Sequence, residues 1–201
     1  MDQTDDELLA RQDARQAEAA EVLADLDVMA LLGRVGRPVQ TGASALGLML
    51  TLDIDITTLC PSLDVTDAFD LGRNLVVHPR VQRVTFRNDT GAWNTSPDYP
   101  DGLYWMVEYV SAGGTAWKLD LWLIKEGTTQ FDLEHMRTLP HRLDRERRAA
   151  ILRIKEARAA NPDAPKIPSF DIYEAVLDHD VRTPAEFEAY LDRRRDAPPP
   201  P

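Results

Sequence analysis

The chain has 201 residues, of which 43% are hydrophobic and 28% charged, and its formal net charge is −11. This length suits a soluble globular protein with one core, or with one core and a small helical annex. No apolar run approaches the ~18 residues of a membrane span, and the acidic start at 1–7 is unlike a secretory signal, so we expect a cytoplasmic protein without a membrane partner. The single cysteine excludes an intrachain disulfide, and the acidic balance argues against broad attachment to nucleic acid.

The first quarter of the chain predicts helices followed by two strands. Residues 5–32 are rich in good helix formers with apolar side chains at helical intervals, which predicts one or two helices. A short strand is predicted over Val39–Thr41 and a short helix over Ser44–Met49. Residues Leu52–Leu59 alternate with a period of two, which predicts a second strand.

The middle of the chain predicts one helix and three further strands. The helix covers Asp64–Val77, and its first residue is a good N-terminal cap. A strand over Val81–Arg87 leads into Asn88–Asp101, a loop of the length that usually carries function. Leu103–Ser111 and Ala116–Ile124 then form a predicted hairpin around two glycines.

The last third of the chain predicts three helices, over Leu143–Ala160, Asp171–Leu177 and Ala185–Arg194. Thr183 and Glu186 have the spacing of a capping box at the start of the third one.

These elements predict an α+β fold, in which a mixed β-sheet is flanked by helices and followed by a C-terminal helical segment. We divide the chain into an N-terminal helical segment (1–35), a core (36–127), the C-terminal helical segment (128–195) and a proline-rich, disordered tail (196–201).

Two aspartates on the second predicted strand form a candidate metal site. Asp53 and Asp55 project from one face of the strand, while Ile54 and Ile56 face the other way into a core. Mg²⁺ prefers one or two carboxylates together with phosphate oxygens and water. The pair therefore predicts a site for magnesium bound with a phosphorylated ligand.

A turn of small residues comes just before this strand. Gly42, Ala43 and Ser44 let backbone N–H groups approach an anion at the start of the following helix, where the helix dipole also favours negative charge. The turn predicts a place for a triphosphate beside the metal. Taken alone, the same residues also fit an ordinary strand-to-helix turn beside a solvated strand.

Together these residues resemble the polymerase-β-like nucleotidyltransferase superfamily. Its pattern is a Gly-Ser turn, about ten residues, an Asp-x-Asp strand and later a third acidic residue on another strand. The resemblance covers roughly residues 36–126 and rests on Gly42 with the pair Asp53 and Asp55. The pattern's serine is Ala43 here, and Ser44 follows one residue later.

The third acidic residue of the pattern has a candidate in Asp120, which interrupts an otherwise apolar strand. Strand alternation places Lys118 on the same face as Asp120, where its charge can neutralise a triphosphate. Arg87 is a second candidate for this role. Glu108, on the preceding strand, is the rival to Asp120.

The resemblance implies a nucleotidyltransferase that moves a nucleoside monophosphate from an NTP, such as ATP, to a hydroxyl acceptor. In this hypothesis Asp53, Asp55 and Asp120 are catalytic and bind two Mg²⁺ ions, and Asp120 is also the general base. The β- and γ-phosphates bind at Gly42–Ser44. The acidic composition favours a small, cationic acceptor over nucleic acid.

Two other hypotheses remain. A member of the same fold can bind a nucleotide or a partner without turnover, and Ala43 in place of the serine keeps this possibility open. Alternatively, the sheet is only a scaffold for a protein that binds a partner in a stress or toxin system.

Three further groups of residues have both a structural and a functional interpretation. The four histidines show no metal-binding spacing; His135 and His141 flank a predicted loop after the third acidic residue. One basic helix can contact phosphate or be a solvated face of mixed charge, through Arg142, Arg145, Arg147, Arg148, Arg153, Lys155 and Arg158. Most aromatic residues around the long loop and hairpin belong to the core, and one or two can stack on a nucleobase, from the set Trp93, Tyr99, Tyr104, Trp105, Trp117 and Trp122.

Overall fold

The computed structural model describes residues 4–96, 99–128 and 130–196. Residues 14–140 form one compact unit, and residues 1–13 with 141–201 form a second. The segment boundaries at residues 36 and 128 stay predictions. Residues 197–201 of the predicted tail lie outside the described residues.

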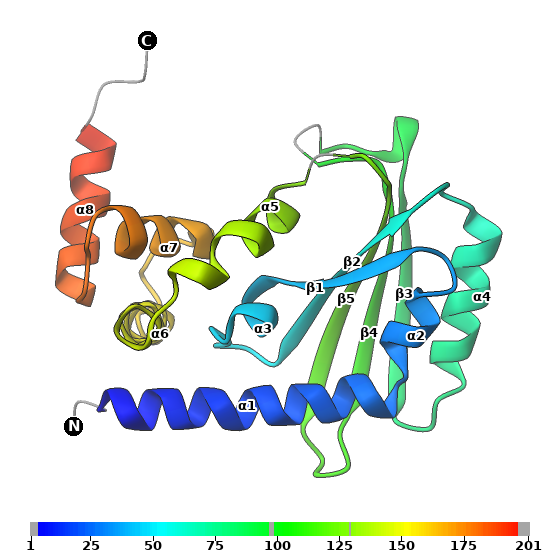
Figure 1. The fold of residues 1–201 in the computed structure, drawn as a ribbon, viewed down its shortest axis with the longest axis horizontal. Coiled ribbons are helices and arrows are strands. Elements are labelled where there is room, and N and C mark those ends of the chain that lie inside the picture. Colours follow the sequence, from blue (N-terminus) through cyan, green and yellow to red (C-terminus); the bar gives the residue numbers. More distant parts are fainter. Residues whose placement is uncertain (1–3, 97–98, 129, 197–201) are drawn as a thin grey trace. The chain divides into compact units, whose positions relative to one another are not determined.

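The larger unit is built on one mixed sheet with the strand order β1-β2-β5-β4-β3 (Figure 1). β2 and β5 run parallel, and the other neighbouring strands are antiparallel. The predicted α+β class with a mixed sheet is therefore confirmed. The strands are β1 (Arg37–Thr41), β2 (Asp53–Cys60), β3 (Val81–Asp89), β4 (Gly102–Val110) and β5 (Ala116–Lys125).

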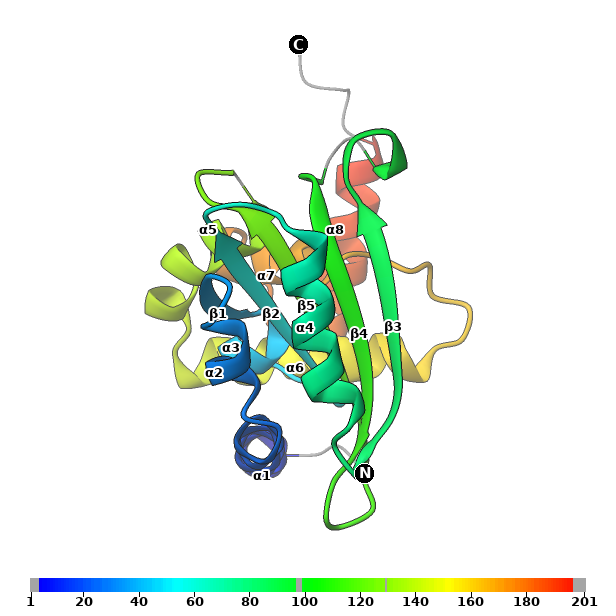
Figure 2. The ribbon, with the colours of Figure 1, turned by 90° about the vertical axis from the view of Figure 1, so that its right-hand side faces the viewer.

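Helices cover one face of this sheet and bury its apolar side chains. Figures 1 and 2 show α2 (Val28–Leu32) and α4 (Val65–Val76) on that face. The C-terminal half of α1 (Asp5–Asp25) adds Ala19 and Val22 to the same core. Ile54 of β2 and Leu119 of β5 are fully buried there, as the alternation of both strands predicted. Polar residues of the same strands consequently lie on the opposite face.

The helix after the glycine turn is shorter than predicted. α3 runs from Gly42 to Leu46 and ends at Gly47, which has a left-handed backbone with φ of 68°. This conformation is easy for glycine and closes the helix. Leu48 and Met49 therefore leave the helix and are fully buried.

A helix that the sequence did not reveal follows β5. α5 (Phe131–Thr138) begins without a side-chain cap, so the usual start signal is missing from the sequence. It contains His135, and His141 lies in the short 3₁₀ turn Pro140–Arg142. The prediction that these histidines flank a loop was wrong.

The smaller unit contains the three predicted C-terminal helices, α6 (Arg145–Ala160), α7 (Ser169–Asp178) and α8 (Pro184–Asp196). The capping box is present: Thr183 N–H donates to Glu186 Oε2 at 3.0 Å and Glu186 N–H donates to Thr183 Oγ1 at 3.2 Å. None of the helices in the described ranges combines the length and apolar character needed to cross a membrane.

The basic helix α6 forms ion pairs with acidic residues of the chain's own N-terminal segment. Arg145 pairs with Asp6, and Arg153 pairs with Asp5. These acidic partners were not foreseen, because they lie about 140 residues away in the sequence. The pairing supports a face of mixed charge rather than a phosphate contact.

Candidate active site

The three predicted carboxylates lie on the face of the sheet opposite to the apolar core. Asp55 on β2 and Asp120 on β5 are direct partners across the parallel strands, and Asp53 is the partner of Lys118. Neighbouring strands lie about 4.8 Å apart, so Asp55 and Asp120 are close neighbours. The sequence placed each residue on a strand face, and the register brings these faces together.

The glycine turn lies directly against Asp55. Gly42 follows Thr41, which pairs with Asp55 across β1 and β2, and its φ is +66°. A Cβ at Gly42 would lie 2.3 Å from Asp55 Oδ2. Glycine is required at this position both for its backbone conformation and for the close approach of the carboxylate.

The charges in this cluster repel one another. Burial, together with the nearby charges of Asp120 and Asp53, raises the pKa of Asp55 to about 7. Lys118 opposes this shift, whereas Asp132 of α5, a residue the sequence reading missed, adds to it. A carboxylate destabilised by neighbouring carboxylates is a favourable place for a cation.

Asp120 is held by two donors. The hydroxyl of Tyr104 on β4 donates to Asp120 Oδ1 at 2.6 Å, and Lys118 Nζ lies 2.8 Å from Asp120 Oδ2. Burial and this hydrogen bond raise the pKa of the Tyr104 phenol. Burial lowers the pKa of Lys118, but the bond to Asp120 and the nearby aspartates outweigh that effect and raise it overall. Both donors therefore keep their protons at neutral pH.

The side chains of the turn do not all face the site. Ser44 is buried; its hydroxyl donates to the backbone oxygen of Thr41 at 3.4 Å and accepts from Gln40 Nε2 at 3.1 Å. This hydroxyl is used inside the turn. Any anion contact by Gly42, Ala43 or Ser44 consequently depends on backbone N–H groups.

Glu108, the rival to Asp120, lies farther from Asp55. It is on β4, opposite Lys118, and forms an ion pair with Arg83 of the edge strand β3. Strand β5 lies between it and β2, the strand of Asp55, and the position opposite Asp120 is Met106. The geometry favours Asp120 as the third carboxylate.

The donor set of the site fits Mg²⁺ bound together with phosphate. Among residues 4–96, 99–128 and 130–196, no three His, Cys, Asp or Glu side chains already form a cage that could hold a metal alone. Mg²⁺ in phosphate-binding sites is commonly held by one or two carboxylates plus substrate oxygens. Asp55 and Asp120 supply such carboxylates, and the burial and neighbouring aspartates that raise the pKa of Asp55 also favour a cation beside it.

The contacts of an aromatic group beside Asp120 were found only in the structure. The rings of Tyr104 and Trp122 are 4.7 Å apart, and the Arg87 guanidinium lies 4.6 Å from the Tyr104 centroid and 5.4 Å from that of Trp122. The alternation of β5 predicts that Trp122 shares the face of Asp120. The sequence did not show that Tyr104 and Trp122 are cross-strand partners.

In its sheet and flanking helices, the chain has the fold of the polymerase-β-like nucleotidyltransferases. One similar solved structure is Cid1, described as having RNA terminal uridylyl transferase activity, with a TM-score of 0.59 at 17% identity over 82% of this chain and 47% of that one. Another is the STING-associated CdnE c-di-GMP synthase of Capnocytophaga granulosa, with a TM-score of 0.54 at 12% identity over 83% and 60%.

A third structure, of Cid1 with the UTP analog UMPNPP, has a TM-score of 0.53 at 17% identity over 80% of this chain and 48% of that chain. This chain therefore spans about half to three-fifths of the length of these proteins. No protein-family model and no curated protein matches the sequence.

Proposed function

We propose that this chain is a metal-dependent nucleotidyltransferase that transfers a nucleoside monophosphate from an NTP to a hydroxyl group of a small acceptor. The observation that carries the proposal is the pairing of Asp55 with Asp120 on adjacent parallel strands, with the Gly42 turn packed against Asp55. Solved structures of the same fold support it, since Cid1 has been captured with MgATP and with MgGTP.

The proposed reaction is an in-line substitution at the α-phosphorus. The acceptor oxygen forms a bond to that phosphorus, the bond to the oxygen bridging to the β-phosphate breaks, and pyrophosphate leaves. The hydroxyl proton goes to Asp120, which acts as general base. Mg²⁺, when bound by Asp53, Asp55 and Asp120, supplies charge stabilisation for the attacking and leaving oxygens.

The other predicted residues have supporting roles in this proposal. Backbone N–H groups of Gly42, Ala43 and Ser44 bind the β- and γ-phosphates, beside the carboxylate of Asp55. Lys118 neutralises phosphate charge, and its ion pair with Asp120 holds it at the site. The net charge of −11 supports a small acceptor over a long polyanion.

A transfer assay tests the proposal. The full chain is incubated with Mg²⁺, each of the four α-labelled NTPs and a small-molecule extract, and labelled product and pyrophosphate are measured. We expect wild-type protein to yield both in equal amounts. Asp53→Asn and Asp120→Asn should each reduce the rate roughly 1,000-fold, since several kcal/mol of transition-state stabilisation is lost.

Asp70→Asn is the matched control, because Asp70 is an exposed aspartate on α4, away from the carboxylate cluster. We expect it to keep the wild-type rate. NTP binding without product in every extract contradicts transfer and indicates a nucleotide-binding module. Equal rates in wild type and Asp53→Asn contradict the assignment of the site.

A further inference from the structure

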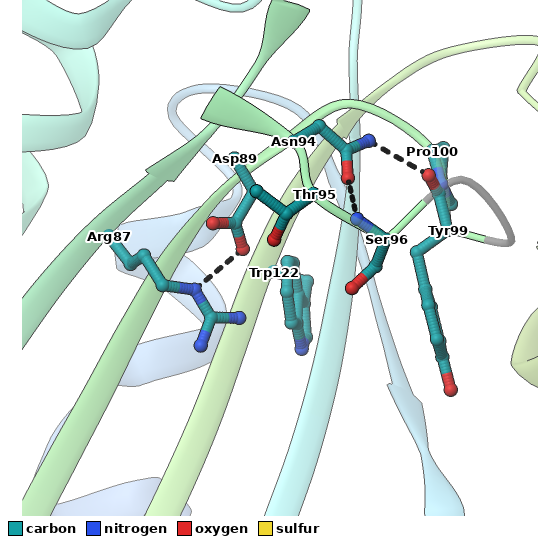
Figure 3. Close-up of a pocket in the computed structure, with 8 residues that line it drawn as sticks. All are labelled: Arg87, Asp89, Asn94, Thr95, Ser96, Tyr99, Pro100 and Trp122. Carbon is teal, nitrogen blue, oxygen red and sulfur yellow. Dashed lines mark hydrogen bonds and ion pairs between the residues drawn. The ribbon is translucent and has the colours of Figure 1, made fainter. Parts of the chain in front are cut away.

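A hollow of about 440 Å³ lies beside the candidate active site, between strands β3 and β5 and the loop that joins β3 to β4. Figure 3 shows Arg87, Asp89 and Trp122 rising from the sheet, and Ser96 and Tyr99 entering from the loop. Its size falls within the range of ~300–1,000 Å³ that small-molecule sites occupy. The hollow is therefore large enough for a ligand of nucleoside size.

Aromatic rings line the hollow from both sides. Trp122 belongs to the sheet, whereas Tyr99 comes from the loop and is 59% exposed, and both rings are seen nearly edge-on in Figure 3. An exposed ring beside an open hollow is a good surface for stacking a flat, apolar-faced group. Nucleobases stack on such rings with little dependence on their identity.

Described residues of the loop that carries Tyr99 are joined by hydrogen bonds. Asn94 Nδ2 donates to the Tyr99 backbone oxygen at 2.9 Å and to Asp101 Oδ1 at 3.2 Å. Gly91 N–H donates to Asp101 Oδ2 at 3.0 Å. Tyr99 is consequently positioned at the hollow by its backbone, while its ring keeps a free face.

The hollow carries little net charge. Arg87 Nε donates to Asp89 Oδ2 at 2.6 Å, so the two charged side chains that line the hollow neutralise each other. The Arg87 guanidinium also lies over the Trp122 ring, 5.4 Å from its centroid. A neutral, aromatic hollow favours the base and sugar of a ligand, and offers little to a chain of phosphates.

The hollow lies near Asp120, the proposed general base. Trp122 follows Asp120 by two residues on the same face of β5, a separation of roughly 7 Å along the strand. Tyr104 bridges the two, since its ring packs on Trp122 and its hydroxyl bonds Asp120. A sugar attached to a base in the hollow is therefore within reach of Asp120.

We propose that this hollow binds the base of a nucleoside acceptor, stacked on Trp122 and Tyr99, and presents a ribose hydroxyl to Asp120. This inference rests on the proposed nucleotidyl transfer, because a bound nucleoside is an acceptor only if the chain is a transferase. It narrows the acceptor from any small hydroxyl compound to a nucleoside or mononucleotide. A nucleoside is preferred to an RNA chain because the Arg87–Asp89 pair leaves no excess positive charge for further phosphates.

Tryptophan fluorescence of the full chain tests nucleoside binding directly. In a Trp93→Phe background, Trp105 and Trp117 are buried, so Trp122 is the tryptophan that reports on the hollow. Adenosine, guanosine, uridine and cytidine are titrated without Mg²⁺, which keeps the contribution of the triphosphate site small. We expect all four to quench saturably with similar affinities, and ribose to have no effect.

Variants locate this binding. Tyr99→Leu is expected to weaken nucleoside binding roughly five-fold or more, since a stacking surface is lost. Phe170→Leu removes another exposed aromatic ring, in the smaller unit, and is expected to leave the affinity unchanged. Circular dichroism confirms that each variant is folded. Quenching by ribose equal to that by adenosine, or unchanged affinity in Tyr99→Leu, overturns the inference.

Further measurements distinguish a failure of nucleoside binding from a failure of the proposed transfer. Asp53→Asn is expected to bind nucleosides like the parent protein, because Asp53 does not line the hollow. If no NTP is ever transferred but nucleosides still bind, the proposed function falls and the nucleoside site stands. If transfer occurs only to acceptors without a base, the nucleoside site falls alone. A ten-nucleotide RNA that binds at least ten-fold tighter than its nucleosides overturns the choice of a nucleoside over RNA.

Discussion

Replacing Asp55 with asparagine is expected to stabilise the metal-free protein at pH 8 while abolishing transfer. Burial and two neighbouring aspartates raise the pKa of Asp55 from 3.8 to about 7. A carboxyl group with a raised pKa in the folded state contributes stability that is present below about pH 4 and is lost as the pH rises through 7. At pH 8 the folded wild type must therefore hold an unfavourable charge that Asp55→Asn removes.

The size of this effect follows from the pKa. A rise from 3.8 to about 7 corresponds to about 4 kcal/mol at 1.36 kcal/mol per pH unit. Water screens part of the repulsion, so we expect a gain of about 2 kcal/mol, or roughly 4–8 °C in Tm. Thermal unfolding of both proteins at pH 4 and pH 8 measures it, and the difference should be small at pH 4.

Magnesium and activity complete the Asp55 experiment. Mg²⁺ with an NTP should raise the Tm of wild type at pH 8 more than that of Asp55→Asn, since binding stabilises the folded state. Transfer by the variant should fall roughly 1,000-fold. The exposed control Asp70→Asn should show no pH-dependent gain. If Asp55→Asn is less stable than wild type at pH 8, the claim that the charge of Asp55 destabilises the folded protein is wrong.

The faces of the strands could be predicted from the sequence, but the partners across them could not. The alternation in β2 and β5 placed Asp53, Asp55 and Asp120 on polar faces, because a period of two is a local property. That Asp55 lies opposite Asp120 depends on a parallel register between strands about 65 residues apart, which no local pattern determines. The sequence therefore supplied the candidates, and the fold brought them together.

The surroundings of the site depended even more on distant contacts. Tyr104 holds Asp120 across β4 and β5, and Asp132 acts on Asp55 from a helix whose start has no cap signal. The hollow forms where a loop folds back over Trp122. Such features arise from the meeting of separate segments, so their residues are individually ordinary in the sequence.

Gly42→Ala is expected to move the carboxylate of Asp55 while leaving its charge in place. A residue with a side chain at φ of +66° costs about 1–2 kcal/mol, and the new Cβ would lie 2.3 Å from Asp55 Oδ2. Because this atom is the end of a side chain, Asp55 can turn away without disrupting the sheet. We expect the free energy of unfolding to fall by about 1–2 kcal/mol, the cost of the left-handed backbone. We also expect transfer to fall at least roughly 100-fold, because a misplacement of a reacting group by about 1 Å has an effect of this size.

Gly114→Ala provides the matched control for the backbone. Gly114 also has a positive φ, of +84°, but a Cβ there meets nothing within 4 Å. We expect it to lose similar stability and to keep wild-type transfer. If the turn acts through Asp55, Gly42→Ala should lower transfer no further in an Asp55→Asn background, because residues that act as a unit are not additive. Full transfer by Gly42→Ala would instead mean that the close packing of the turn on Asp55 has no part in the reaction.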